Sequence, residues 1–150
     1  MQQLKTDMRK GILLVCSTLM LSLAAAGQNA VDAHRFTVDI TDMNPLAYST
    51  RIVSGEGYSF ALRNDSVTFY LPYMGEAHMA DFNTDGLNMS KPIYNQKWTK
   101  GKKGTDEIDF RCRRDMVEYQ FHITLYPEGQ AYIFLQPSNA QSISYRGNME

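Results

Sequence analysis

The sequence is poor in cysteine, in long apolar runs and in excess charge, and each shortage excludes a class of protein. Only Cys16 and Cys112 occur among 150 residues, which excludes the disulfide framework of many small secreted domains. The apolar run at 12–23 is shorter than the roughly 20 residues that a membrane-spanning helix needs. A net charge of −1 provides no bulk attraction for nucleic acid or anionic lipid, so neither partner is expected.

The sequence also lacks the short motifs that carry common catalytic chemistry. The histidines His34, His78 and His122 have no metal-ligand spacing, and there is no G-x-S-x-G turn or phosphate-binding glycine loop. Cys112 falls on the apolar face of its strand, which predicts a buried and unreactive thiol. We therefore expect no catalytic residue, metal site or cofactor, and we expect that the protein is not an enzyme.

The N-terminus has the pattern of a secretory signal peptide. Its parts are a basic region (Lys5, Arg9 and Lys10), an apolar region (12–23) and a small-residue region (24–27). This pattern predicts a signal peptide over 1–27, cleaved after Ala26 or Gly27, so that the processed chain begins near Gln28. The processed chain, 28–150, is then a single domain in the periplasm or outside the cell, with no membrane span.

Apolar and polar residues alternate with period two along most of the remaining chain, which is typical of strands with one buried face. The segments with this pattern, or with a short apolar run, are 36–41, 58–63, 67–71, 108–112, 119–125, 131–135 and 143–145. No segment has the period of an amphipathic helix over three turns, so the sheet must cover itself. The sequence predicts an all-β domain of about eight strands, an antiparallel up-and-down barrel or a two-layer sandwich.

The connections and the core follow from the same pattern. Short turn-forming segments favour the up-and-down barrel, whereas the irregular region 72–94 reads as long loops or a broken strand. The residues expected inside are Phe36, Val38, Phe60, Leu62, Phe69, Leu71, Phe110, Phe121, Ile123 and Leu125.

Three segments of the chain resemble a family of exported bacterial proteins. They are the run 58–62 (YSFAL), the Leu-Pro-Tyr-x-Gly motif at 71–75 and the run 143–147 (ISYRG). With the signal peptide and 43–45 (MNP), they are similar to the domain-of-unknown-function family numbered 4251. The resemblance implies export and a single domain, and it brings no catalytic residue.

The chain is rich in aromatic side chains, with nine tyrosines, seven phenylalanines and one tryptophan. A tyrosine buries a large ring but needs a partner for its hydroxyl, so these residues serve structural hydrogen bonds or a binding surface. The composition favours a non-catalytic binding protein for a small apolar or aromatic ligand held at a barrel mouth. The alternative is a protein-interaction or inhibitor module that acts through a strand edge or a tyrosine-rich surface.

The expected ligand-binding residues lie where a strand breaks at Pro72 and in a basic segment. The set is Tyr73, Met74, His78, Trp98 and Arg111. Seven cations between Lys97 and Arg114, near Trp98, are typical of a site for a polyanion or a carboxylate, although nearby acids can neutralise them.

A separate modification site is suggested by the triplet Asp65-Ser66-Val67. Its order of acid, hydroxyl and apolar residue resembles an O-glycosylation triplet of some Gram-negative bacteria. It falls in an expected hairpin turn, which would expose Ser66.

Overall fold

The computed structural model describes residues 31, 34–74 and 87–150. The chain divides into two compact units, Met1–Arg35 and Phe36–Glu150. In the first unit, the His34 amide donates a hydrogen bond to the Val31 carbonyl oxygen at 2.9 Å. The predicted signal peptide and its cleavage position, Gly27 and Gln28, lie outside the described residues. The features below belong to the second unit.

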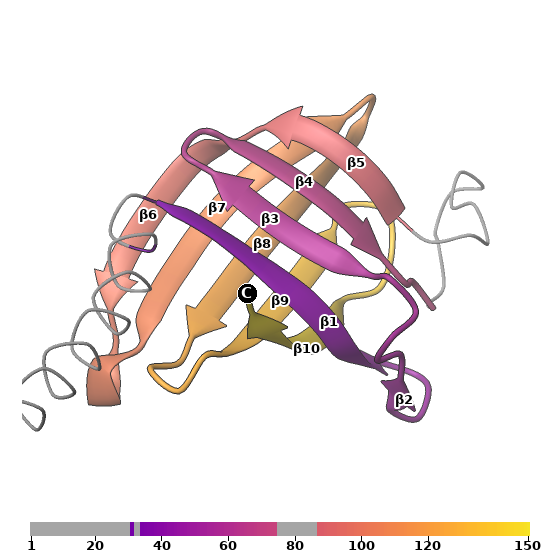
Figure 1. Cartoon of the computed structure of the whole chain (residues 1–150). Coiled ribbons are helices and arrows are strands. Elements are labelled where there is room, and N and C mark those ends of the chain that lie inside the picture. Colours follow the sequence, from indigo (N-terminus) through magenta and orange to yellow (C-terminus); the bar gives the residue numbers. More distant parts are fainter. Residues whose placement is uncertain (1–30, 32–33, 75–86) are drawn as a thin grey trace, which may run out of the picture. The chain divides into compact units, whose positions relative to one another are not determined.

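An antiparallel sheet forms this unit, which confirms the all-β prediction (Figure 1). Its elements are β1 (Arg35–Pro45), β2 (Arg51–Ile52), β3 (Ser59–Arg63), β4 (Ser66–Leu71), β5 (Leu87–Pro92), β6 (Tyr94–Lys100), the 3₁₀ turn η1 (Lys102–Gly104), β7 (Asp106–Arg114), β8 (Val117–Leu125), β9 (Gln130–Pro137) and β10 (Ile143–Met149). Neighbouring strands follow the order β5-β4-β3-β1-β10-β9-β8-β7-β6, and β2 pairs with β1 beside this path. Among the described residues, no helix is long and apolar enough to cross a membrane.

The sheet curls into a nearly closed, up-and-down barrel. Most neighbours are consecutive in the chain, and the pairing of β1 with β10 joins its two halves. The strands β5 and β6 lie at opposite ends of the path although they follow one another directly. At the bend between them, the Ile93 amide donates a hydrogen bond to the Asp65 carbonyl oxygen at 2.8 Å. One bent stretch of chain therefore provides both edge strands (Figure 1).

Three strands differ from the sequence prediction. The strand β5 occupies part of the region 72–94 that was expected to be loop or broken strand, and neither β2 nor β6 was predicted. The strand β2 has only two residues, too few for a period to be visible. In β6 the register shifts between Tyr94 and Lys97, and Asn95 has a φ of 53°. Such a bulge interrupts the alternation from which a strand is predicted.

The predicted core is confirmed, since all ten residues expected inside are buried. Its centre is aromatic. The ring of Phe60 lies between 5.6 and 6.3 Å from the rings of Phe36, Phe69, Phe110 and Phe121, measured between centroids. Contacting rings of this kind occupy the middle of the barrel and stabilise it beyond the burial of their area.

The junction of β1 and β10 is tightly packed. Gly147 pairs with Ile40, next to a shift of register in β1. A β-carbon added at Gly147 would lie 2.2 Å from the Asp39 carbonyl oxygen. Only glycine fits this close approach of two backbones.

Candidate functional site

The segment after β4, where a ligand-binding rim was expected, makes hydrogen bonds to distant backbone groups. The Tyr73 hydroxyl donates to the Gln141 carbonyl oxygen at 3.0 Å, and the Tyr145 hydroxyl donates to the Pro72 carbonyl oxygen at 2.8 Å. Burial raises the pKa of both tyrosines, that of Tyr145 well above its usual value of 10. These two hydroxyls therefore connect the end of β4 to the region around β10.

The five residues expected to bind a ligand do not form one constellation within the described chain. Met74 is exposed, and His78 lies outside the described residues. Trp98 makes an edge contact with the core ring of Phe36, at 6.3 Å between centroids. Arg111, in contrast, lies on the outer face of β7, where its partners in the register are Tyr94 and Gln120. Trp98 and Arg111 are thus on opposite faces of the sheet.

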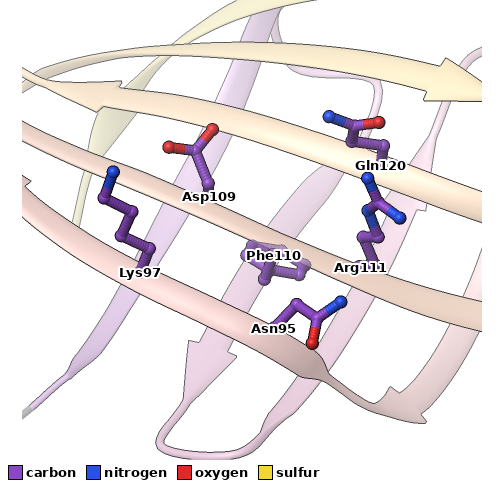
Figure 2. A pocket seen from close by; sticks show the side chains of 6 residues that line it. All are labelled: Asn95, Lys97, Asp109, Phe110, Arg111 and Gln120. Atoms are coloured by element: carbon purple, nitrogen blue, oxygen red, sulfur yellow. The ribbon is translucent and has the colours of Figure 1, made fainter.

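A groove does open on the outer face of β6, β7 and β8, with a volume of about 280 Å³. We call it the outer groove. Its lining residues are Asn95, Lys97, Asp109, Phe110, Arg111 and Gln120. Figure 2 shows Lys97 and Asp109 on one side and Asn95, Arg111 and Gln120 on the other, while the ring of Phe110, which is buried in the core, lies behind the ribbon of β7.

The bulge in β6 separates the two sides of the outer groove. Tyr94 pairs with Arg111 and Lys97 pairs with Asp109, so β6 advances three residues while β7 advances two. Asn95, in the middle, adopts a left-handed φ, which asparagine tolerates better than most residues. Bulges turn side chains in new directions, and here the side chain of Asn95 lies at the rim (Figure 2).

The carboxylate of Glu118 holds Arg111, the cation on one side of the outer groove. Glu118 Oε1 lies 3.3 Å from Arg111 Nη1, and Glu118 Oε2 lies 3.4 Å from Arg113 Nη2. The Tyr94 hydroxyl donates to Glu118 Oε2 at 2.7 Å. This hydrogen bond, together with the two guanidinium groups, lowers the pKa of Glu118. Glu118 is thus ionised at neutral pH and shared between two arginines.

Asp109 has a different partner. Its Oδ1 lies 2.7 Å from His122 Nδ1, on the neighbouring strand. In the described part of the chain, Lys97 has no carboxylate within 4.0 Å that forms an ion pair with it. Of the seven cations in the basic segment, Lys100, Arg111 and Arg113 have acidic partners, Asp106 for the lysine and Glu118 for both arginines. Neutralisation by acids is therefore partial.

A second surface of interest is formed by the connection from β1 to β2 and by β2 itself, which display apolar side chains. Leu46, Tyr48 and Ile52 expose 70, 53 and 74% of their surfaces, and we call them the apolar corner. Buried Val53 anchors the connection, because its amide donates a hydrogen bond to the Thr41 carbonyl oxygen at 2.8 Å. Thr50 also donates a hydrogen bond to the Asn44 side chain. The apolar corner is thus held in place.

Two tyrosines continue this surface. The ring of Tyr58, the residue before β3, lies 4.9 Å from the ring of Tyr70 in β4, and we call these two residues the tyrosine pair. Burial, Tyr70 and Glu56 raise the pKa of Tyr58, while Arg51 lowers it. Since Arg51 and Glu56 form an ion pair at 3.5 Å, the tyrosine pair lies beside the β2 end of the apolar corner.

The structure gives the surroundings of Cys112 and Ser66, two residues singled out in the sequence. Cys112 is buried, as predicted, and burial raises the pKa of its thiol from 9.0 to about 12. Ser66 begins β4 at the expected hairpin turn, and its hydroxyl donates to the Arg63 carbonyl oxygen at 3.3 Å. Among the described residues, no group of three or more His, Cys, Asp or Glu side chains could hold a metal ion.

The remaining site residues were missed from the sequence. Asn95 and Gln120 carry no motif, and they meet at the outer groove only through the bulge and the register of three strands. The apolar corner left a weak signal, because Leu46, Tyr48 and Ile52 are apolar residues outside any segment of period two. The tyrosine pair forms only when β3 and β4 pair, which brings Tyr70 to Tyr58.

The sequence and the fold are both similar to known ones. A family model described as Domain of unknown function (DUF4251) matches residues 22–149. The crystal structure of a DUF4251 family protein from Bacteroides eggerthii DSM 20697, at 1.95 Å resolution, is similar with a TM-score of 0.60. Its sequence is 15% identical, and the match covers 84% of this chain and 83% of that chain, so the likeness shows the fold. A search of curated proteins finds no match.

Proposed function

Because this chain belongs to the DUF4251 family, whose description assigns no activity, we propose from its own geometry that it is an exported, non-catalytic protein-interaction module. The basic, apolar and small-residue regions within 1–27 support export. The surface proposed to bind is the apolar corner with the adjoining tyrosine pair. This is the alternative raised by the sequence, in the form of a tyrosine-rich surface.

The observation that carries the proposal is the exposure of Leu46, Tyr48 and Ile52 on a connection that is held in place. Clustered apolar side chains on the outside of a protein mark interaction sites. Covering Leu46 and Ile52 completely would contribute about 1.5–3 kcal/mol each. Tyrosine is also enriched among the residues that dominate binding energies.

The charges beside the apolar corner favour a protein as its occupant. Arg51 and Glu56 form an ion pair there, so the charged rim is balanced. An anionic lipid surface would instead attract a cluster of lysine and arginine residues. A partner protein fits this surface if it has an apolar patch surrounded by both positive and negative side chains.

The same geometry gives less support to a small apolar ligand inside the barrel. The ring of Phe60 contacts four other phenylalanine rings in the centre. The hydroxyls of Tyr73 and Tyr145 are engaged with the backbone carbonyls of Gln141 and Pro72. The outer groove is on the other face of the sheet and is lined mainly by polar side chains.

Capture from the native host tests the proposal. The protein recovered from its host is analysed by native mass spectrometry, and a stoichiometric heteromeric complex is expected. A Leu46→Ser/Ile52→Ser variant should lose the complex, because the apolar contact is removed. The matched control is Met116→Ser, which changes a side chain that is 94% exposed at the β7–β8 turn.

Three results would contradict the proposal. A complex that survives in Leu46→Ser/Ile52→Ser does not use the apolar corner. A complex lost equally in Met116→Ser depends on general surface hydrophobicity. A purified wild-type protein that forms only homodimers through the same residues would identify a second copy as the occupant.

A further inference from the structure

We propose that the outer groove is a binding site for a small hydroxylated carboxylate of the sugar-acid class, with Lys97 and Arg111 as its cationic contacts. This inference is independent of the protein-interaction surface, because the outer groove is formed by β6, β7 and β8 and the apolar corner follows β1. It rests on the placement of charges, on the bulge in β6 and on the volume.

The charges around the outer groove leave a positive excess. The cations Lys97, Arg111 and Arg113 face two carboxylates, Asp109 and Glu118. Asp109 is engaged with His122 at 2.7 Å, and Glu118 is shared by both arginines. A ligand whose carboxylate pairs with Arg111, and whose hydroxyl accepts a hydrogen bond from Lys97 on the opposite side of the outer groove, would complete this arrangement.

Arg111 is held in position without being saturated. Within the described parts of the chain, only its Nη1 forms an ion pair, at 3.3 Å from Glu118 Oε1, whereas a guanidinium group has five N–H donors. The Glu118 carboxylate is itself held by Tyr94 at 2.7 Å. The remaining donors of Arg111 can therefore bind a second carboxylate in a fixed orientation.

The other lining groups are suited to hydroxyls. Asn95 and Gln120 each offer an amide donor and an amide acceptor, and the second oxygen of Asp109 is an acceptor. Amide and carboxylate side chains at fixed positions hydrogen-bond hydroxyl groups, which simple aliphatic acids lack. The side chain of Asn95 reaches the rim because of the bulge (Figure 2).

The volume limits the size of the ligand. At about 280 Å³, the outer groove is smaller than the roughly 300–1,000 Å³ of pockets for drug-sized molecules. It is open to solvent on the outside of the sheet, so affinity is expected on the order of millimolar. A single sugar acid, rather than a long chain, matches these dimensions.

The test is an NMR titration of the ¹⁵N-labelled protein with D-glucuronate, with D-glucose and acetate as separate arms. We expect D-glucuronate to shift the amide signals of 95–97, 109–111 and 120 in a saturable manner. The dissociation constant should rise with ionic strength, because the contact is between charges at the surface. D-glucose and acetate should bind at least tenfold more weakly, since D-glucose lacks the carboxylate and acetate lacks the hydroxyl groups.

Matched substitutions link the binding to the site. Lys97→Gln and Arg111→Gln should each weaken D-glucuronate binding about tenfold, the loss of one charge-assisted hydrogen bond. Lys102→Gln and Arg63→Gln remove exposed cations elsewhere and should leave binding unchanged. Asn95→Gly removes the amide but keeps the left-handed φ, so it should weaken binding without backbone strain.

Specific results would overturn this proposal. Absence of saturable shifts at the outer groove excludes the site, and equal binding of acetate excludes a sugar acid as the ligand class. Equal losses in Lys102→Gln and Lys97→Gln would indicate nonspecific attraction. The groove variants are expected to keep the heteromeric complex, so failure here is distinguishable from failure of the protein-interaction proposal.

Discussion

The Tyr145 hydroxyl donates a hydrogen bond to the carbonyl oxygen of Pro72, 73 residues earlier in the chain, at 2.8 Å. Tyr145 is completely buried, so its hydroxyl and the Pro72 carbonyl satisfy one another where water has no access. An unpaired buried polar group is destabilising. This bond therefore fixes the path of the chain where β4 ends.

Replacing Tyr145 with phenylalanine should lower the free energy of unfolding by about 1–3 kcal/mol, because the Pro72 carbonyl is left unpaired. Urea unfolding measures the difference. Tyr132→Phe is the control, since Tyr132 is half-buried on the outer face of β9. Similar losses in both variants would show that the hydrogen bond to Pro72 is not the cause.

The stability should also fall at alkaline pH. Burial raises the pKa of Tyr145 well above 10 and that of Tyr73 in the same direction. The unfolded chain releases these protons near pH 10, whereas the folded chain keeps them, so above this pH the unfolded state binds fewer protons. The free energy of unfolding then decreases as the pH rises.

Urea unfolding between about pH 9 and pH 12 measures this decrease. Its slope with pH should be smaller in Tyr145→Phe than in the wild type, because one of the shifted groups is absent. Identical slopes would contradict the assignment to Tyr145.

The aromatic centre of the barrel makes Phe121 a sensitive position. Its ring lies 5.0 Å from Phe110, 5.3 Å from Phe69 and 5.6 Å from Phe60, between centroids. Phe121→Ala should lower the free energy of unfolding by about 3–5 kcal/mol. The control is Phe134→Ala, on the outer face of β9, where a smaller loss is expected. If Phe121→Ala lowered the free energy of unfolding less than Phe134→Ala does, the central position of Phe121 would be contradicted.

The contact between Gly147 and Asp39 predicts a strong effect of one added methyl group. Gly147→Ala places a β-carbon 2.2 Å from the Asp39 carbonyl oxygen, and overpacking of this kind costs about 1–3 kcal/mol or more. Thermal unfolding compares it with Asn148→Ala, an exposed neighbour. Equal melting temperatures for the two variants would show that β1 and β10 separate easily.

Cys112 should be unreactive in the folded protein. Burial raises the pKa of its thiol to about 12, so almost no thiolate is present at pH 8, and thiolate is the reactive form. A disulfide reagent such as Ellman's reagent should modify Cys112 only after urea is added. Rapid modification of the folded protein would reveal local opening of β7.

The sequence predicted burial correctly where residues alternate between apolar and polar along a strand. Phe36 and Val38, or Phe60 and Leu62, alternate with polar residues because one face of each strand is buried. Their burial and the all-β class could therefore be predicted. Extra strands were missed where the pattern is interrupted, by the two-residue length of β2 and by the bulge at Asn95 in β6.

The candidate sites depend on pairings that no local pattern encodes. Tyr73 was expected at a binding rim, but its hydroxyl reaches Gln141, 68 residues away. Arg111 and Lys97 were both noticed as cations, whereas their juxtaposition with Gln120 and Asn95 requires the register of β6, β7 and β8. A sequence shows which side chains carry charges or amides, but it does not show which of them meet when the strands pair.

The pairing of β1 with β10 has a kinetic consequence. Val38 pairs with Met149 and Pro45 pairs with Ile143, so this seam joins segments about a hundred residues apart. Closing so long a loop costs conformational entropy of the chain before the contacts of the seam form. Sheets with such long-range contacts fold in milliseconds to seconds. Until the seam forms, β1 presents an unpaired edge, the kind of edge on which partly folded chains aggregate. Variants that weaken this seam should therefore increase aggregation during refolding more than they lower the stability of the native barrel.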